Sequence, residues 1–214
     1  MKILNSLAAA AMLAVISTSA SAAVVFTFTE VSGDVKMTSS GSLDTSKMVL
    51  LGTDGWGGVG IENNANGQTD IMGGTSFGQN DITYTFNAGT DQSAWLNPGG
   101  PFSVSTANFF GDWVVDSGSK SFATYGFINS LRNAGMSMVR SDIVGGIWTP
   151  DQNWTNANDT FASLGMNVGT WTVADALTGE SITIQVGQVP VPASLPLLLA
   201  GLAGIAALKR RKTS

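Results

Sequence analysis

The residues that could do chemistry in this chain are few, because its 214 amino acids include neither histidine nor cysteine. Without histidine the chain lacks the most common general base and the most common transition-metal ligand. Without cysteine it has no disulfide, no thiolate metal site and no thiol nucleophile. A Ser-His-Asp triad and a histidine-based zinc site are therefore excluded.

Carboxylates are the groups left for acid–base catalysis, and a glycosidase needs only a pair of them. The chain has 12 aspartates and 3 glutamates, which are Glu30, Glu62 and Glu180. Glu30 and Glu180 fall at the edges of expected strands, where we expect them to be solvated. With 12 aspartates some pair will be close by chance, so proximity alone would not indicate an active site. A carboxylate-based hydrolase is the least favoured of three functional hypotheses.

Two segments are rich in the oxygen ligands that Ca²⁺ prefers. One contains Asp151, Asn153, Asn158 and Asp159, and the other contains Asp54, Glu62, Asn63, Asn64 and Asp70. Neither has the ordered spacing of an EF-hand or of a Ca²⁺-binding repeat. Asp and Asn are also common in turns for backbone reasons. We therefore expect no cofactor, with Ca²⁺ at Asp151, Asn153 and Asp159 as the alternative.

Six tryptophans could form a binding surface, because an exposed indole ring can stack on a sugar. Three of them lie within strand patterns and are expected in the core: Trp113, Trp148 and Trp171. The other three lie among turn-forming residues, where exposure is easier: Trp56, Trp95 and Trp154. These three are the predicted sugar contacts if the protein is a carbohydrate-binding module.

Short strands are the elements that would have to position these side chains. The chain has 26 glycines and only 12% charged residues, and Ser, Thr, Asn and Gly separate its apolar stretches. Strand patterns cover residues 24–31, 34–37, 47–51, 81–86, 101–104, 109–115, 143–148, 171–173 and 181–186. A helical period is suggested only at residues 127–133. We predict an all-β domain, an antiparallel β-sandwich of jelly-roll-like form.

The net charge of the expected domain is more negative than that of the whole chain, because five basic residues lie in the terminal segments. Residues 23–188 contain all 15 carboxylates but only 5 of the 10 basic residues, which gives a net charge of about −10. Such an acidic domain is unlike proteins that bind nucleic acid or anionic membrane surfaces. We therefore expect no nucleic-acid partner.

The first 22 residues have the features of a secretory signal peptide. Lys2 supplies the positive charge, an apolar stretch follows, and Ala20-Ser21-Ala22 is a small-x-small cleavage site. We predict cleavage by signal peptidase between Ala22 and Ala23.

The last 26 residues, 189–214, have a three-part pattern. Val189-Pro190-Val191-Pro192-Ala193 is held extended by its prolines. Residues 195–208 then predict a short apolar transmembrane helix, about 21 Å long against a hydrocarbon core of about 30 Å. Lys209, Arg210, Arg211 and Lys212 follow as a stop-transfer signal that keeps the C-terminus in the cytoplasm. A GPI-anchor signal is the rival interpretation, but such tails normally end apolar, without a basic cluster.

This tail resembles the PEP-CTERM class of bacterial sorting signals, and most closely its VPLPA-CTERM variant, with Val191 in place of the usual leucine. The resemblance implies a Gram-negative host and recognition by an exosortase-type transpeptidase of the inner membrane. It also implies removal of the tail and delivery to the cell surface or to an exopolysaccharide matrix.

A looser resemblance concerns the domain. DTFASLGMNVGTWTV, with ESITIQVG shortly after it, looks like the end of many exported PEP-CTERM domains, in which a one-turn helix, here 161–164, precedes two final strands. FTFTEVSGDVKMTSSGSLD looks like their first hairpin. No activity follows from this resemblance.

The leading functional hypothesis is a non-enzymatic protein with three parts: a signal peptide (1–22), an exported domain (23–188) and a sorting signal (189–214). It would cross the inner membrane, stay anchored there transiently, and then act at the cell surface or in the matrix. A carbohydrate-binding module is the alternative.

Overall fold

The computed structural model describes residues 22–53, 58–63, 69–74, 79–96, 99–103, 107–109, 112–125 and 133–187. In these ranges the chain forms fifteen short strands and three single turns of 3₁₀ helix. The predicted all-β class is confirmed.

The first sheet has six strands in the order β14-β15-β1-β2-β13-β9. Their bounds are β1 Ala23–Val31, β2 Asp34–Gly41, β9 Trp113–Ser117, β13 Asn153–Asn156, β14 Gly169–Ala174 and β15 Ser181–Val186. β1 runs antiparallel to β2 but parallel to β15, so that Ala23 lies beside Ser181 and Phe28 beside Val186. The expectation of a purely antiparallel sandwich is wrong at this pair, because the two ends of the domain meet as neighbouring strands.

The second sheet has seven strands in the order β4-β7-β11-β10-β6-β5-β8. Their bounds are β4 Val49–Gly52, β5 Gly60–Asn63, β6 Thr69–Gly73, β7 Ile82–Thr85, β8 Ala107–Phe109, β10 Phe122–Tyr125 and β11 Gly135–Met138. Every pairing between these strands is antiparallel. A separate two-stranded sheet pairs β3 (Leu43–Asp44) with β12 (Ile147–Trp148). The 3₁₀ turns are η1 Thr45–Lys47, η2 Ser93–Trp95 and η3 Arg140–Asp142.

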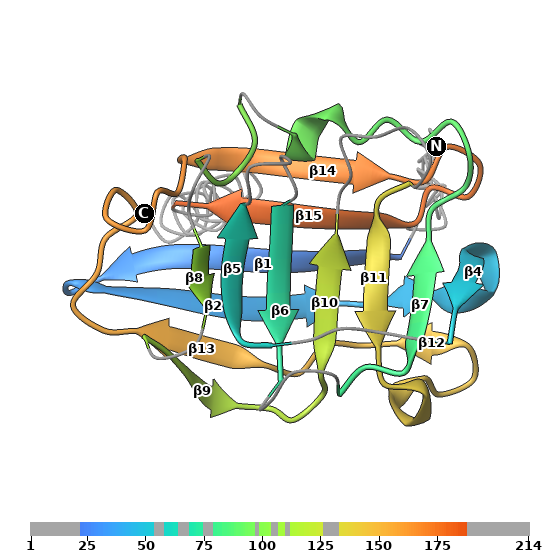
Figure 1. Ribbon diagram of the computed structural model, residues 1–214, viewed down its shortest axis with the longest axis horizontal. Coiled ribbons are helices and arrows are strands. Elements are labelled where there is room, and N and C mark those ends of the chain that lie inside the picture. Colours follow the sequence, from blue (N-terminus) through green and yellow to red (C-terminus); the bar gives the residue numbers. More distant parts are fainter. Residues whose placement is uncertain are drawn as a thin grey trace, which may run out of the picture.

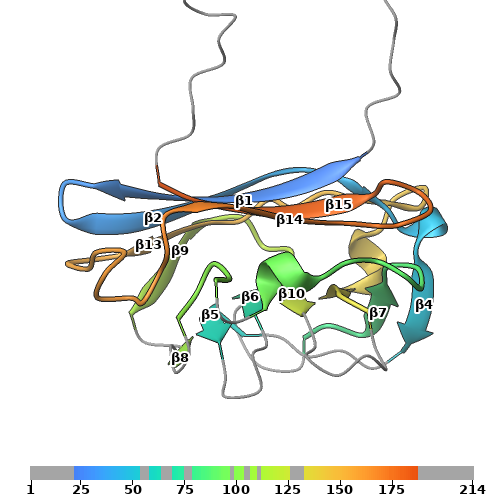
Figure 2. The same ribbon diagram turned by 90° about the horizontal axis from the view of Figure 1, so that it is seen from above.

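The two large sheets form two layers that face one another (Figure 2). The strands of the second sheet run across those of the first rather than along them (Figure 1). The core between the layers is aromatic, and Phe122 of β10 stacks on Phe26 of β1 with ring centroids 4.9 Å apart. Phe122 also stacks on Trp154 of β13, at 5.9 Å and an interplanar angle of 8°. The two layers therefore share one core.

The β1–β2 hairpin forms where the sequence predicts it. Phe26 and Phe28 are fully buried while Thr27 and Thr29 are half-exposed, as the alternating pattern requires. Ser32 and Gly33 both have positive φ, 57° and 88°. Two consecutive positive φ values are typical of the tight turn that joins two twisted strands.

Other strand predictions are confirmed in part. Strands exist at 82–85, 169–174 and 181–186, and shorter ones replace the predictions at 47–51 and 109–115. In 143–148 only Ile147 and Trp148 form a strand, because Val144 and Ile147 close a tight turn around Gly145 and Gly146, both with positive φ. No strand covers 101–103, where Phe102 makes an isolated bridge to Met166. Residue 104 and the predicted helical period at 127–132 lie outside the described residues.

The segment before β14 forms a turn, as expected for 161–164. The Leu164 N–H donates to the Thr160 carbonyl at 3.1 Å, and the Met166 N–H donates to the Phe161 carbonyl at 2.7 Å. This turn is not long enough to count as a helix, but it leads into β14 and β15 as predicted.

Candidate functional site

Two of the three predicted sugar-binding tryptophans are fully buried. Trp95 and Trp154 are both 0% exposed, so neither ring has a face that a sugar could reach, and their assignment as surface contacts is wrong. Trp113 and Trp148 are buried, which confirms that they belong to the core. Trp56, the third candidate, lies outside the described residues.

Trp154 is buried because it belongs to a strand rather than to a loop. β13 alternates so that Trp154 and Asn156 face the core while Asn153 and Thr155 are partly exposed. The indole N–H of Trp154 donates to the Gln152 side-chain oxygen at 2.7 Å. The polar residues around this tryptophan therefore supply its partner and do not mark an exposed loop.

Trp171, which was expected in the core, is only partly buried. Its indole N–H donates to the Gly99 carbonyl at 2.7 Å. Its ring covers Gly169, where a Cβ would come within 2.8 Å of the ring edge. Trp171 thus fastens the edge strand β14 to the segment after η2. Among the described tryptophans it is the one that is not buried, and one ring does not make a stacking platform.

The residues predicted to hold Ca²⁺ do not come together. Asp151 precedes β13 and accepts the N–H groups of Ser119 and Lys120 at 3.1 and 3.0 Å. Asn153 donates to the Ser117 hydroxyl, and Asp159, beyond the other end of β13, accepts from the Ser163 hydroxyl. Asn158 has a positive φ of 61°. Each side chain serves its local turn, as Asp and Asn commonly do, and Ca²⁺ binding at these residues stays a prediction.

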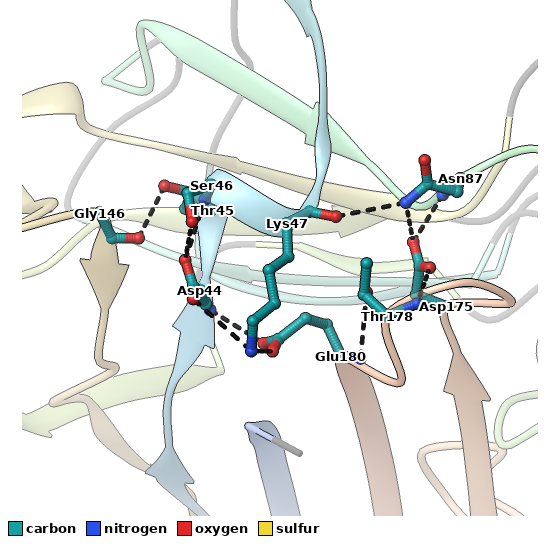
Figure 3. A network of polar contacts seen from close by, with 9 residues as sticks. All are labelled: Asp44, Thr45, Ser46, Lys47, Asn87, Gly146, Asp175, Thr178 and Glu180. Carbon is teal, nitrogen blue, oxygen red and sulfur yellow. Dashed lines mark hydrogen bonds and ion pairs between the residues drawn. The ribbon is translucent and has the colours of Figure 1, made fainter.

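Glu180 forms the first of two carboxylate centres that the structure does assemble (Figure 3). Its side chain is fully buried, contrary to the expectation that it is solvated. It accepts the Lys47 ammonium at 2.9 Å and the Asp44 N–H at 2.9 Å. Glu30, by contrast, is exposed as expected and accepts the Phe161 N–H.

The groups around Glu180 are fixed by their neighbours. A hydrogen bond from Ser46 keeps the pKa of Asp44 below its ordinary value. The hydrogen bond to Glu180, and the charge of that carboxylate, raise the pKa of Lys47. A lysine with a raised pKa stays an ammonium at neutral pH and cannot act as a nucleophile. The Glu180 carboxylate thereby joins the start of β15 to β3 and to the turn η1.

Asp175 extends the same network towards the second sheet (Figure 3). It is buried, and its carboxylate accepts the backbone and side-chain N–H groups of Asn87 at 2.6 and 2.8 Å. It also accepts the N–H groups of Leu177 and Thr178. Asn87 in turn donates to the Lys47 carbonyl at 3.2 Å. The β14–β15 turn, the segment after β7 and the turn η1 are therefore joined at one end of the molecule.

Asp70 and Glu62 form the second centre, on the hairpin β5–β6. They are directly paired across the two strands, so their side chains lie on the same face of the sheet. Asp70 is 0% exposed, and neither of its carboxylate oxygens has a hydrogen-bond partner among the described residues. Burial, and then the charge of Glu62, raises the pKa of Asp70 well above its ordinary value. Burial also raises the pKa of Glu62.

The sequence contains a signal for this second centre that composition alone did not reveal. Glu62 and Asp70 both belong to an oxygen-rich segment, but their pairing depends on β5 and β6, which were not predicted. Asn66-Gly67, between the two strands, is a dipeptide typical of hairpin turns. With that dipeptide as a guide, the two carboxylates would be expected to face one another.

The predicted processing sites can be placed only in part. Ala22 and Ala23 lie at the start of β1, whereas Ala20, the motif 189–193 and the basic residues 209–212 are outside the described residues. None of the helical segments in the described part of the chain has the length and apolar character needed to span a bilayer. The predicted span, 195–208, lies beyond that part.

The comparisons give no relative from which a role could be transferred. Comparison of the chain with protein-family models, with curated proteins and with solved structures finds no match.

Proposed function

We propose that this chain is a non-enzymatic exported protein whose β domain is carried to the cell surface or to an exopolysaccharide matrix by its C-terminal sorting signal. One observation carries the proposal. The first and last strands of the domain begin and end beside the two segments that the sequence marks for removal. In finer detail, the proposal includes a jelly-roll-like sandwich, for which the two layers around one core are the support.

At the N-terminal side, β1 starts at Ala23, the first residue after the predicted signal-peptidase cut. Pairing of β1 with β2 and β15 begins at Val24 and Ala23 respectively. Cleavage after Ala22 would remove only the hydrogen bond from the Ser181 N–H to the Ala22 carbonyl. Signal peptidase could therefore act without disturbing the sheet.

At the C-terminal side, β15 ends at Val186, and the Gly187 N–H still donates to the Phe28 carbonyl at 3.0 Å. The motif begins two residues later, at Val189. An exosortase-type transpeptidase acting on 189–193 would leave all of β15 in the domain. Because β1 and β15 are parallel, the tail leaves the sheet at the end opposite to Ala23. While it is anchored, the protein would thus point its new N-terminus away from the membrane.

The chemistry of the described side chains fits a structural role better than a catalytic one. Glu180, Asp175 and Asp151 are occupied by hydrogen bonds that hold turns and strands. The domain is strongly acidic, which favours solubility outside the cell over contact with nucleic acid.

The test is to isolate the protein from producing cells and from the surrounding matrix, and to map both termini by mass spectrometry. We expect Ala23 at the N-terminus and a C-terminus within or next to 189–193. Replacing Pro190 and Pro192 with alanine should block removal of the tail. Val191→Leu, which restores the usual motif, is the matched control and should be processed as before. Recovery of the protein from the cytosol with both ends uncut would refute the proposal.

A further inference from the structure

The carboxylates of Glu62 and Asp70 are placed in a way that needs a partner. They are direct neighbours across β5 and β6, on one face of the second sheet. Side chains in such positions have Cβ atoms about 4.5–5.5 Å apart, and two like charges there repel one another. A folded protein keeps such a pair only where something offsets the repulsion.

Asp70 adds a second and independent requirement. It is fully buried, and both of its carboxylate oxygens lack a hydrogen-bond partner in the described part of the chain. Buried polar groups in native structures are almost always hydrogen-bonded, and buried carboxylates are paired or bind metal ions. An orphaned buried carboxylate therefore points to a ligand.

No basic side chain that the structure describes fills this role. Lys47 is paired with Glu180, and the Lys120 ammonium donates to the Thr149 carbonyl. Lys36 lies on β2, in the other sheet, and Arg140 lies in η3; both side chains are exposed. Burial and the charge of Glu62 raise the pKa of Asp70, and no positive group acts against them. The pair can be balanced by a proton or by a positive charge from outside the described residues.

We propose that Glu62 and Asp70 bind a hard divalent cation, and that this cation is Ca²⁺. A divalent ion neutralises both carboxylates and occupies the oxygens of Asp70 that are without partners. Carboxylate oxygens suit Ca²⁺ and Mg²⁺ rather than softer metals. Mg²⁺ requires near-octahedral geometry and retains its water, whereas Ca²⁺ accepts irregular sets of six to eight oxygens. A buried carboxylate beside a half-buried one fits the ion that gives up water more readily.

The affinity of this site is expected to be low. The described residues place no third carboxylate with the pair, so water or carbonyl and amide oxygens complete the shell. Sites with few charged ligands fall in the range of extracellular modules, with Kd on the order of 10⁻⁴ to 10⁻³ M. The inference is independent of the proposed function, because it depends only on the hairpin β5–β6.

The experiment uses the full-length chain, exported with its own terminal segments and then stripped of metal by a chelator. Ca²⁺ is titrated by calorimetry, and thermal unfolding is followed in parallel. We expect one ion per chain, and at about a tenfold excess over Kd a rise in Tm of about 3–6 °C. Mg²⁺ at the same concentration should give a smaller rise.

Two variants and a control assign the site. Asp70→Asn and Glu62→Gln should each abolish the rise in Tm with Ca²⁺. The double variant Asp151→Asn/Asp159→Asn removes the other oxygen-rich segment and should bind as before. Asp70→Asn has a further signature. Because it removes an unpaired buried charge, the metal-free variant should be at least as stable as the metal-free wild type.

The results that overturn the proposal are equally specific. Absence of binding up to about 10 mM Ca²⁺ would do so, since even weak extracellular sites fill at that level. So would binding that survives both single substitutions, or a clear preference for Mg²⁺. If the metal-free wild type were more stable than Asp70→Asn and indifferent to both ions, a shared proton would explain the pair instead.

Discussion

Most strands of the first sheet, namely β1, β2, β13 and β14, are partly exposed on one face, whereas the central strands of the second sheet are buried on both faces. β1 alternates regularly between buried and partly exposed residues. All four residues of β10, and all four of β11, are buried. One-sided burial produces an alternating sequence, while burial on both faces removes the alternation.

The buried outer face of the second sheet is polar, which is the deeper difference. The hydroxyls of Thr83 and Ser137 share a hydrogen bond of 2.7 Å across β7 and β11. The Tyr125 hydroxyl passes over Gly135 to donate to the Tyr84 carbonyl at 2.9 Å. Asp70 lies on this same face. The outer face of the first sheet also has a hydrogen bond between hydroxyls, those of Thr172 and Thr183, but it is only partly buried, whereas the one between Thr83 and Ser137 is fully buried.

Phe122→Ala should have the largest effect, because this side chain is where the two sheets meet. Its ring stacks on Phe26 and Trp154 and meets the edge of Trp148 at 5.7 Å. Removing a fully buried phenylalanine costs about 3–5 kcal/mol of unfolding free energy. Chemical denaturation measures the loss. Val114→Ala on the exposed side of β9 is the control and should cost less than about 0.5 kcal/mol.

Gly135→Ala tests whether the second sheet tolerates less change than the first. A Cβ there would collide with the Tyr84 carbonyl oxygen and lie 2.8 Å from the Thr85 Cα, so backbone must move. We expect a loss of about 3 kcal/mol. The matched control is Gly33→Ala in the β1–β2 turn, where a Cβ meets nothing within 4 Å. Only the left-handed φ opposes it, at about 1–2 kcal/mol. Equal losses would contradict the comparison.

The same difference explains which strands could be predicted. FTFT alternates because one face of β1 is partly exposed. SITIQV alternates too, although Ser181 and Thr183 on its outer face are buried, and glycine marks the turn that joins each strand to its hairpin partner. FATY and GMSM, the strands β10 and β11, contain small and polar residues that are buried for tertiary reasons. Nothing in their sequence separates them from loops, because burial on both faces leaves no alternation of polar and apolar residues.

The errors at the candidate sites have a similar cause. Trp154 has polar neighbours and looks like part of a loop, yet pairing with β2 and β9 makes its segment a central strand. Glu180 was expected in solvent, but Lys47, 133 residues away, covers it. The pairing of Glu62 with Asp70 required a hairpin whose strands carry no alternating pattern. In the first two cases a long-range contact, absent from local sequence, decides burial.

Glu180→Gln tests the contacts that join the two sheets at one end of the molecule. Glu180 immediately precedes β15, and Asp44 and Lys47 lie shortly before β4, at the edge of the second sheet. The neutral side chain weakens a charge-assisted hydrogen bond in a buried position, at about 1–2 kcal/mol. Thermal unfolding at low and high salt measures the loss. Lys47→Gln should cost more, because it leaves the fully buried Glu180 carboxylate without its ammonium partner, and the opposite order would contradict the link.

Acid should produce the smallest effect, through Asp175 in the same network. Burial by itself raises the pKa of Asp175, but hydrogen bonds from Asn87, Leu177 and Thr178 outweigh it and bring the pKa below its ordinary 3.8. The stabilisation from this carboxylate is therefore present above pH 3.8 and is lost as the pH falls below it, through the folded-state pKa. Between about pH 7 and about pH 5, titration of Asp175 should not change the Tm of the wild type.

Asp175→Asn should lower Tm at neutral pH. Its Tm should then fall less in acid than the Tm of the wild type does, because the group that titrates is gone. Asp116→Asn, where an exposed carboxylate accepts only from Thr155, is the control and should follow the wild-type curve. If Asp175→Asn and the wild type fell in parallel below pH 3.8, the hydrogen bonds that join the β14–β15 turn to the segment after β7 would not depend on the charge of Asp175. The link between the two sheets at that end would then rest on other contacts, such as the Lys47–Glu180 pair and the hydrogen bond from the Ala176 N–H to the Thr90 hydroxyl.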